Sequence, residues 1–184
     1  MADQKYPTGE FVFDKEITPD RRILLISELA GFAASLRSAV RGLSEEQLDT
    51  PYRVGGWTVR QLAHHLADSS LNWYARFKMA LTEENPRIKP FEQDSWSILI
   101  DARTMPPEVS VNLLESVHAR MATVLRSLTS ADFARTMIHP ERGLISVDYT
   151  LQTLHWHCRH HLAHIDALRN QKGWQDSARS RGML

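Results

Sequence analysis

The segment "WHCRHHLAHIDAL", Trp156 to Leu168, carries four of the nine histidines in the chain. On an α-helix at about 100° per residue, these four imidazoles fall within one sector that is roughly 100° wide. Apolar residues border that sector, with Leu154, Cys158, Leu162 and Ile165 on one side and Trp156, Ala163 and Ala167 on the other. A helix face of this kind should look into a protein core. The segment therefore predicts a helix that packs in a bundle and brings imidazoles into it.

Outward from this segment, the helical pattern covers about residues 147–172 and ends before Gly173, a residue that suits a helix C-terminus. Three further long patterns precede it, at about residues 19–41, 58–81 and 108–128. Four long helices in 184 residues predict an all-α fold, a four-helix bundle that forms a single domain over residues 1–184. The linkers before the third and fourth helices exceed the roughly 2–8 residues usual in bundles, so long crossover connections are expected.

Shorter elements are predicted inside the linkers. In "SEEQ", Ser44 and Gln47 have the spacing of a capping box and favour one helical turn. A short helix is expected around "FEQDSWSILI", and a Pro-Glu-Arg-Gly turn in "ARTMIHPERGLISVDYT" favours a small β-hairpin. Residues 172–184 are expected to form a flexible tail.

The composition excludes several classes of protein. Lys plus Arg and Asp plus Glu are both 22, so no net charge favours nucleic acid or an anionic membrane as a partner. The N-terminal residues lack the apolar stretch of a secretory signal, and we see no apolar run long enough to span a bilayer. The single cysteine excludes an internal disulfide, and a cytoplasmic location is expected.

The second helix contributes two adjacent histidines that differ in orientation. A core stripe is predicted from Val59, Leu62, Ala63, Leu66, Trp73 and Phe77. His64 then falls on the outer face with Arg60, Gln61 and Asp68, and we expect it at the surface. His65 lies in line with Asn72 and Arg76, on a polar stripe along the margin of the core face. His65 is therefore the histidine that can look inward.

A metal site is one interpretation of these histidines. His160 and His164 are four residues apart, as are His157 and His161, so spacing alone does not choose between the pairs. Either pair together with His65 would make a three-histidine site between facing helices, with coordination positions left open for catalysis. The alternative is a seam of hydrogen-bonded core histidines. Burying four imidazoles without a strong partner would be costly, which favours the metal.

Taken together, these motifs resemble the DinB superfamily, and within it the YfiT-like metal-dependent hydrolases, which include bacillithiol transferases. The resemblance runs through "YPTGEF", "LDTPYRVGGWTVRQLAHHLADS", "RFKMALTEENPRIKPFEQDSW", "IHPERG" and "WHCRHHLAHI". It implies a four-helix bundle with crossovers, a homodimer, and a metal held by His65, His160 and His164. The chain departs from the pattern at Ser70, where relatives carry histidine, and at Met121, where they carry tryptophan.

The expected function follows from the predicted metal. One divalent ion per chain is expected, zinc first, with nickel, iron and manganese open. It would activate water for hydrolysis or a low-molecular-weight thiol for S-transfer to a small-molecule substrate. Substrate-binding or supporting roles are predicted for Tyr52, Arg53, Asn72, Arg76, His157 and His161. A non-catalytic metal-binding or stress-associated interaction protein is the alternative. Cys158, on the apolar flank, is expected to be a buried structural cysteine.

Overall fold

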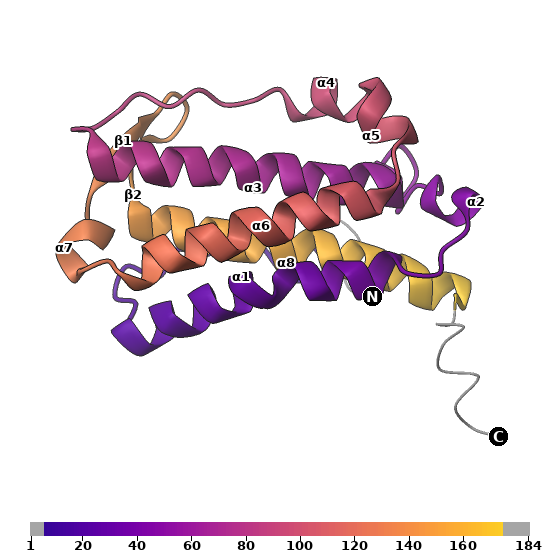
Figure 1. Ribbon diagram of the computed structural model, residues 1–184, viewed down its shortest axis with the longest axis horizontal. Helices are drawn as coiled ribbons and strands as arrows, with labels where there is room; N and C mark the ends of the chain where they lie inside the picture. Colours follow the sequence, from indigo (N-terminus) through magenta and orange to yellow (C-terminus); the bar gives the residue numbers. More distant parts are fainter. Residues whose placement is uncertain (1–5, 175–184) are drawn as a thin grey trace.

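The computed structural model describes residues 6–174, and four long helices form a bundle (Figure 1). They are α1 (Pro19–Val40), α3 (Val59–Thr82), α6 (Pro107–Arg126) and α8 (Val147–Lys172). Together with a small two-stranded sheet, they confirm the predicted fold class. The part of the predicted tail beyond residue 174 lies outside the described residues.

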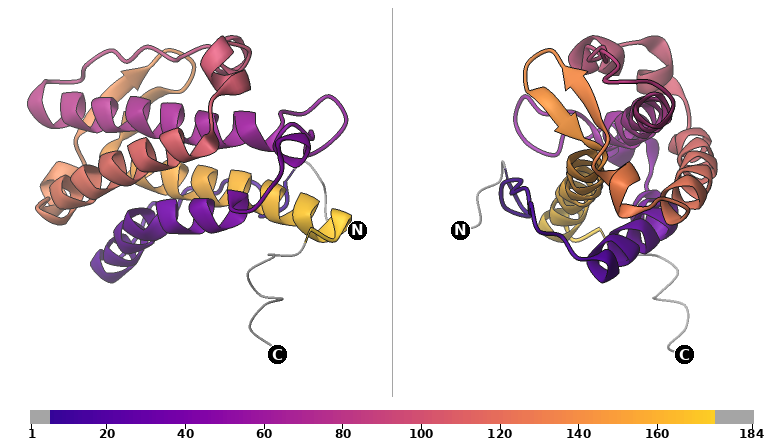
Figure 2. Two further views of the ribbon diagram at one scale, coloured as in Figure 1. Left: turned by 45° about the vertical axis from the view of Figure 1, so that its right-hand side comes forward. Right: turned by 90° about the vertical axis from the view of Figure 1, so that its left-hand side faces the viewer.

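The order of the helices around the bundle differs from their order in the chain. α1 and α8 run in one direction, and α3 and α6 run in the other (Figure 1). Both α1 and α3 pack mainly against α6 and α8, so α1 and α3 occupy opposite corners when the bundle is viewed from one end (Figure 2, right). This arrangement places α3 beside α8, the two helices that carry most of the histidines.

Two long linkers make this topology. Residues 83–106 return along the outside of α3 and contain α4 (Gln93–Ser97) and α5 (Ile100–Thr104) (Figure 1). Residues 127–146 stay at one end of the bundle and contain α7 (Ser130–Phe133) and the hairpin β1 (Thr136–His139) and β2 (Gly143–Ser146). The strands pair antiparallel from Thr136↔Ser146 to His139↔Gly143, which confirms the predicted hairpin. The single short helix expected near residue 95 is a pair of short helices.

Side-chain caps define the helix boundaries. Thr58 accepts a hydrogen bond from the backbone N–H of Gln61, whose side chain accepts from the backbone N–H of Thr58 in return. Ser44 and Gln47 make the same reciprocal pair at α2 (Glu45–Leu48), as predicted. At the other end of the chain, Gly173 terminates α8 in the left-handed conformation, φ +65°.

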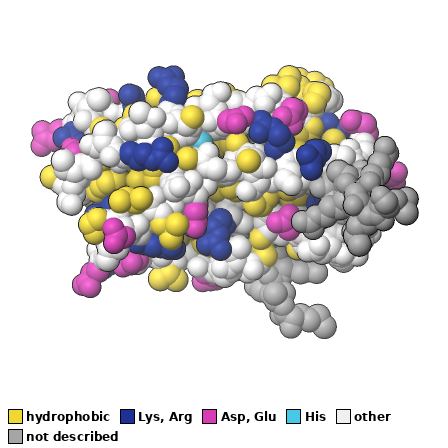
Figure 3. Space-filling view, turned by 60° about the horizontal axis from the view of Figure 1, so that its bottom comes forward, with side chains coloured by type: hydrophobic (Ala, Val, Ile, Leu, Met, Phe, Trp, Pro, Cys, Tyr) yellow, Lys and Arg dark blue, Asp and Glu magenta, His cyan; other side chains and the backbone are white. Residues whose placement is uncertain are grey.

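The apolar stripes of the helices form the core. The apolar stripe of α6 is buried. It consists of Val111, Leu114, Val117, Met121 and Leu125. On α3, the predicted stripe is buried except for Trp73, which is half-buried. By length and composition alone, α1 could also cross a membrane, but the face from Leu25 to Leu36 packs inside the bundle. On the face in Figure 3, positive and negative side chains are interspersed among apolar ones.

The prediction that His64 and Arg60 lie on an outer face was wrong. His64 is only 5% exposed, and its ring nitrogens lie 2.7 Å from Ser110 Oγ and 3.1 Å from the Met105 carbonyl. Arg60 is buried and forms ion pairs with Glu45 and Asp49. The long linker covers this side of α3, so a face that is polar by pattern is enclosed by polar partners.

A buried polar network around Ser70 joins three helices. His118 Nδ1 donates to the carbonyl oxygen of Leu29 at 2.7 Å, which leaves Nε2 to accept from the Ser70 hydroxyl at 2.9 Å. Burial lowers the pKa of His118 to about 4, so the ring is neutral, as this pairing requires. Ser70 is fully buried. The network ties α6 to α1 and α3.

Candidate metal centre

Five histidines gather between α3 and α8. His65 extends from α3, and His157, His160, His161 and His164 extend from α8. The Nε2 atom of His157 lies 3.0 Å from Nε2 of His65 and 3.1 Å from Nε2 of His161. The Nε2 atoms of His160 and His164 lie 3.1 Å apart. The i,i+4 spacing on α8 therefore brings both pairs into contact, as helix geometry requires.

The five rings form two overlapping groups of three. In each group, one ring nitrogen from every member lies within 4.8 Å of the others. The first group is His65, His157 and His161, and the second is His160, His161 and His164. The predicted ligands His65, His160 and His164 are thus divided between the two groups. His161 connects them, with its ring centre 4.9 Å from that of His65 and 6.1 Å from that of His164.

Burial keeps these imidazoles neutral. It lowers the pKa of His157 and of His164 to about 4, and neighbouring His160 lowers both further. Burial also holds the pKa of His65 and of His161 well below the usual value for histidine, and the adjacent His157 adds to the effect. Neutral imidazole is the form that binds a metal, so the cluster carries ligands in the required state near neutral pH.

Protons alone cannot satisfy the contacts at His157. A neutral imidazole nitrogen offers either one N–H or one lone pair, so Nε2 of His157 can make only one of its two close contacts as an ordinary hydrogen bond. In addition, the buried Nδ1 atoms of His157, His160 and His161 have no hydrogen-bond partner within the part of the chain that the structure describes. Converging lone pairs of this kind suit a shared cation.

The donor set and its spacing also fit a divalent ion. Two nitrogens bound to one tetrahedral zinc ion at about 2.0–2.1 Å lie about 3.3 Å apart, close to the spacing of these pairs. Neither group of three includes a carboxylate or thiol, and imidazole ligands suit zinc, copper, iron and nickel. The residues present therefore fit the metal that the sequence predicted.

Aromatic rings enclose the cluster. Trp57 packs on His65 with ring centres 4.5 Å apart, and Tyr52 packs on His164 at 4.2 Å. Trp156 stacks on His160 at 4.7 Å with the ring planes 22° apart. Sequence analysis did not single out Trp57 and Trp156. Trp57 directly follows the double glycine, and Trp156 directly precedes the histidine run. These positions beside the two motifs are the sequence feature that could have indicated a role for both rings at the site.

The loop from Pro51 to Thr58 presents two of these rings. Its ends pair through a backbone hydrogen bond of 3.1 Å from Tyr52 N–H to the Trp57 carbonyl. At its turn, Gly55 adopts φ +69°, and a Cβ on Gly56 would lie 2.9 Å from side-chain atoms of both Tyr52 and Arg53. The double glycine therefore allows the loop to fold tightly, with Tyr52 over His164 and Trp57 over His65.

A cavity of 480 Å³ opens beside the cluster. Its lining includes His157, His160 and His161, together with Tyr52 and Arg53 of the loop. Arg53 donates from Nε to the Tyr52 hydroxyl at 3.1 Å, which leaves the rest of its guanidinium free to bind an anion. The structure thus places four of the six predicted supporting residues, Tyr52, Arg53, His157 and His161, at one cavity.

The other two supporting residues do not line this cavity within the described chain. The Asn72 side chain donates to the Asp68 carbonyl, one turn earlier on its own helix. Arg76 is 5% exposed, donates to the Lys89 carbonyl at 3.0 Å, and lies over the Trp73 ring at 4.6 Å. Substrate-binding roles for Asn72 and Arg76 therefore stay predictions, and their observed contacts are structural.

Cys158 lies beside the cluster without joining it. The cysteine is buried and free, and burial raises the pKa of its thiol above the ordinary value. A thiol held in its protonated form is a poor nucleophile, so the structure agrees with a structural role for Cys158.

The amino-acid sequence is similar to those of known proteins. The sequence profile of the DinB superfamily matches residues 28–165. The chain is 48% identical over 172 residues to a protein of Oceanobacillus iheyensis named "Putative metal-dependent hydrolase", with 94% of this chain and 99% of the relative covered. A Bacillus cereus protein with the same name is 44% identical over 174 residues, with 95% of this chain and 100% of the relative covered.

A solved structure agrees in fold. YfiT from Bacillus subtilis superposes with a TM-score of 0.91 at 43% sequence identity, covering 94% of this chain and 99% of that chain. It is described as "a probable metal-dependent hydrolase with an unusual four-helix bundle topology". The diagonal placement of α1 and α3 is the feature of this chain that departs from a simple up-and-down bundle.

Proposed function

Because the chain belongs to the DinB superfamily, we propose that it is a metal-dependent enzyme that holds one divalent ion at the histidine cluster and acts on a small molecule. The ligands we propose are His65, His160 and His164, and zinc is the first metal to test. The observation that carries the proposal is the gathering of five imidazoles in two overlapping groups of three, which together contain all three proposed ligands.

A divalent ion at this position would act as a Lewis acid and lower the pKa of a coordinated water or thiol. His157 Nε2 lies 3.0 Å from Nε2 of the proposed ligand His65 and 3.1 Å from Nε2 of His161, and burial keeps His157 and His161 neutral beside the site of the ion. Arg53 and the Tyr52 hydroxyl, at the mouth of the cavity, can orient an anionic part of the substrate. The Trp57 ring packs on His65 and the Trp156 ring on His160.

Two reactions fit this arrangement. The names of the relatives favour hydrolysis, and the resemblance to bacillithiol transferases favours transfer of a low-molecular-weight thiol to an electrophile. In hydrolysis, water adds to the electrophilic centre and the leaving group takes a proton. In S-transfer, the thiol sulfur forms the new bond, the leaving group departs, and the thiol proton is released.

A direct assay separates these reactions. Zinc-loaded protein would be incubated with ester and amide substrates, and in parallel with thiols such as cysteine and glutathione plus an alkylating electrophile. We expect product formation in one series, with loss of activity after chelation and in His160→Ala. His139→Ala is the matched control because His139 lies in the hairpin, outside both groups of histidines. Equal product with and without metal in every series would contradict the proposal.

The alternative is a non-catalytic metal-binding protein, and the number of histidines favours it. Five imidazoles in contact could supply a fourth ligand and close the coordination sphere. Spectra of the cobalt-substituted protein, titrated with azide, would decide between the two. A change in the visible spectrum shows an open position and supports catalysis, and an unchanged spectrum supports the closed site.

A further inference from the structure

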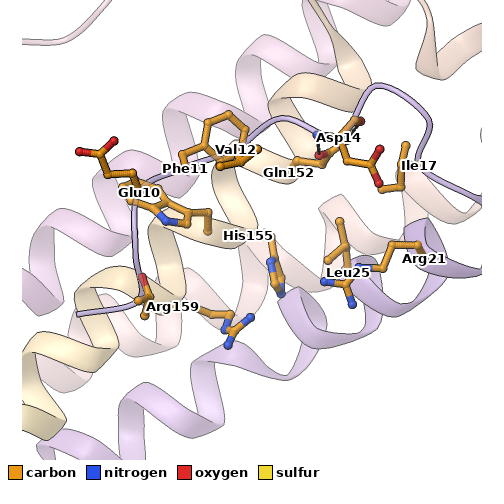
Figure 4. Close-up of a pocket in the computed structure, with 12 residues that line it drawn as sticks. Glu10, Phe11, Val12, Asp14, Ile17, Arg21, Leu25, Gln152, His155 and Arg159 are labelled. Atoms are coloured by element: carbon orange, nitrogen blue, oxygen red, sulfur yellow. Dashed lines mark hydrogen bonds between the residues drawn. The ribbon is translucent and has the colours of Figure 1, made fainter. Parts of the chain in front are cut away.

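A second cavity lies under the N-terminal segment, between α1 and α8 (Figure 4). Its volume is 330 Å³, within the range of small-molecule sites. Among residues 6–174, Trp156 alone lines both this cavity and the one at the histidine cluster. The second cavity is therefore a separate space, and the proposed enzymatic reaction makes no use of it.

The N-terminal segment, residues 8–17, covers the second cavity and is hydrogen-bonded to α8. The backbone N–H of Asp14 donates to Gln152 Oε1, and Gln152 Nε2 donates to the Asp14 carbonyl, both at 2.9 Å. Trp156 Nε1 donates to the Gly9 carbonyl at 3.0 Å. The Phe11 ring packs edge-on against Tyr149 at 5.4 Å. These contacts hold the segment in place at both ends of the cavity.

One side of the cavity is cationic. Arg21 of α1 and Arg159 of α8 both line it, and their side chains extend to the same side as His155 (Figure 4). Neither guanidinium has a hydrogen-bond or ion-pair partner among residues 6–174. His155 is buried and hydrogen-bonded to the carboxylate of Glu28, so that carboxylate is already engaged. Two unpaired guanidinium groups from facing helices suit one anionic group between them.

The other side of the cavity is apolar. Phe11, Val12 and Trp156 line it, and the rings of Phe11 and Trp156 have their centres 6.0 Å apart. Of the acidic residues in the lining, Glu10 extends away from the cavity, and Asp14 accepts a hydrogen bond from the backbone N–H of Glu16. The lining thus combines an anion-binding edge with an aromatic and aliphatic wall.

From this arrangement we propose that the cavity under the N-terminal segment is a second ligand site, which binds a small aryl carboxylate. The carboxylate lies between Arg21 and Arg159, and the ring packs against Phe11 and Trp156. Arg21, Arg159 and Phe11 take no part in the proposed metal centre, and Trp156 borders both sites. The proposal adds a binding function to a part of the chain to which the proposed enzymatic reaction gives no role.

Isothermal titration with 2-naphthoate tests the site. The proteins compared are wild type, the double variant Arg21→Met/Arg159→Met, the single variant Arg53→Met in the histidine cavity, and Arg103→Met as the matched control. Arg103 is an exposed arginine on α5, far from this cavity in sequence. Both arginines of the double variant are exposed, so their replacement should leave folding intact, which thermal unfolding would verify.

We expect wild type, Arg53→Met and Arg103→Met to bind one 2-naphthoate with equal affinity, and the double variant to bind at least about tenfold more weakly, because it lacks both charge-assisted hydrogen bonds to the carboxylate. Uncharged 2-naphthamide should bind wild type as weakly as 2-naphthoate binds the double variant. Absence of binding to wild type at millimolar concentration would overturn the proposal. So would binding that Arg53→Met abolishes and the double variant retains, because the ligand would then occupy the histidine cavity.

Discussion

His65 on α3 and His157 on α8 meet with their Nε2 atoms 3.0 Å apart, and they join two helices that are separated by a long stretch of chain. This contact brings histidines from two different helices together, and the candidate site depends on it. α3 lies beside α8 because the linker of residues 83–106 returns along the bundle and lets α6 occupy the opposite corner from α8. The histidine cluster therefore requires the crossover linker as well as the histidines of α3 and α8.

His64→Ala should lower stability and leave metal binding unchanged. The substitution removes the ring that contacts Ser110 Oγ and the Met105 carbonyl. The carbonyl still accepts a hydrogen bond from Arg60 Nη1, whereas the buried Ser110 hydroxyl loses the ring as its partner. We expect a loss of about 1–3 kcal/mol in the free energy of unfolding, measured by urea titration. Metal content equal to that of wild type would agree with the account. Loss of metal from a folded His64→Ala variant would show that this ring, and not its neighbour His65, faces the ion.

Gly56→Ala and Gly55→Ala should have different consequences for activity. A Cβ on Gly56 would lie 2.9 Å from Tyr52 and Arg53 side-chain atoms, so the Tyr52 ring must move away from His164. A Cβ on Gly55 meets nothing within 4 Å, and its cost is the left-handed backbone alone, about 1–2 kcal/mol. We expect reduced kcat/KM for Gly56→Ala and near-normal kinetics for Gly55→Ala in steady-state assays. Equal kinetic losses in the two variants would argue against a role for the position of Tyr52.

Arg76→Met should affect stability more than catalysis. Arg76 holds the linker through the Lys89 carbonyl and packs on Trp73, outside the lining of the histidine cavity. We expect a lower melting temperature with KM within about twofold of wild type, because a twofold change corresponds to only about 0.4 kcal/mol. A raised KM at an unchanged melting temperature would instead support the sequence-based prediction that Arg76 anchors an anionic substrate.

The metal-free protein should lose stability as the pH falls. The pKa values of His118, His157 and His164 in the folded chain are about 4, whereas histidine in an unfolded chain titrates near about 6.5. Between these values the unfolded state binds protons that the folded state does not. The free energy of unfolding therefore has its full value above about pH 6.5 and falls steadily toward about pH 4. Urea unfolding of chelator-treated protein at several pH values would measure this. A flat profile between pH 7 and 5 would be inconsistent with buried neutral imidazoles.

Helix periodicity predicted much of this fold, because the burial of apolar stripes is a local property of each helix. The core stripe of α6, the termination at Gly173 and the hairpin after Phe133 all follow from residue patterns. Periodicity was wrong at His64 and Arg60, because it cannot show that a linker covers a polar face. His64 contacts Ser110 on α6, and Arg60 pairs with Asp49 at the end of α2, so the partners of both residues lie outside α3.

The candidate site was less predictable than the fold. Sequence patterns identified the histidines, but two i,i+4 pairs on one helix left the choice of ligands to the family resemblance. The structure adds His161 as the residue common to both groups, and it adds Trp57 and Trp156 as the rings that enclose them. Ring packing depends on side-chain directions across two helices and a loop, and a single-helix projection contains no information on these.

The metal content of single histidine variants tests the central claim most directly. Elemental analysis after zinc loading and gel filtration would compare wild type with His65→Ala, His157→Ala, His160→Ala, His164→Ala and the control His139→Ala. The account predicts about one ion per chain in wild type, His157→Ala and His139→Ala, and affinity reduced by more than about 100-fold in the other three, since even changes to residues behind the ligands cost about 10–100-fold. Full occupancy in folded His65→Ala and His160→Ala would contradict it.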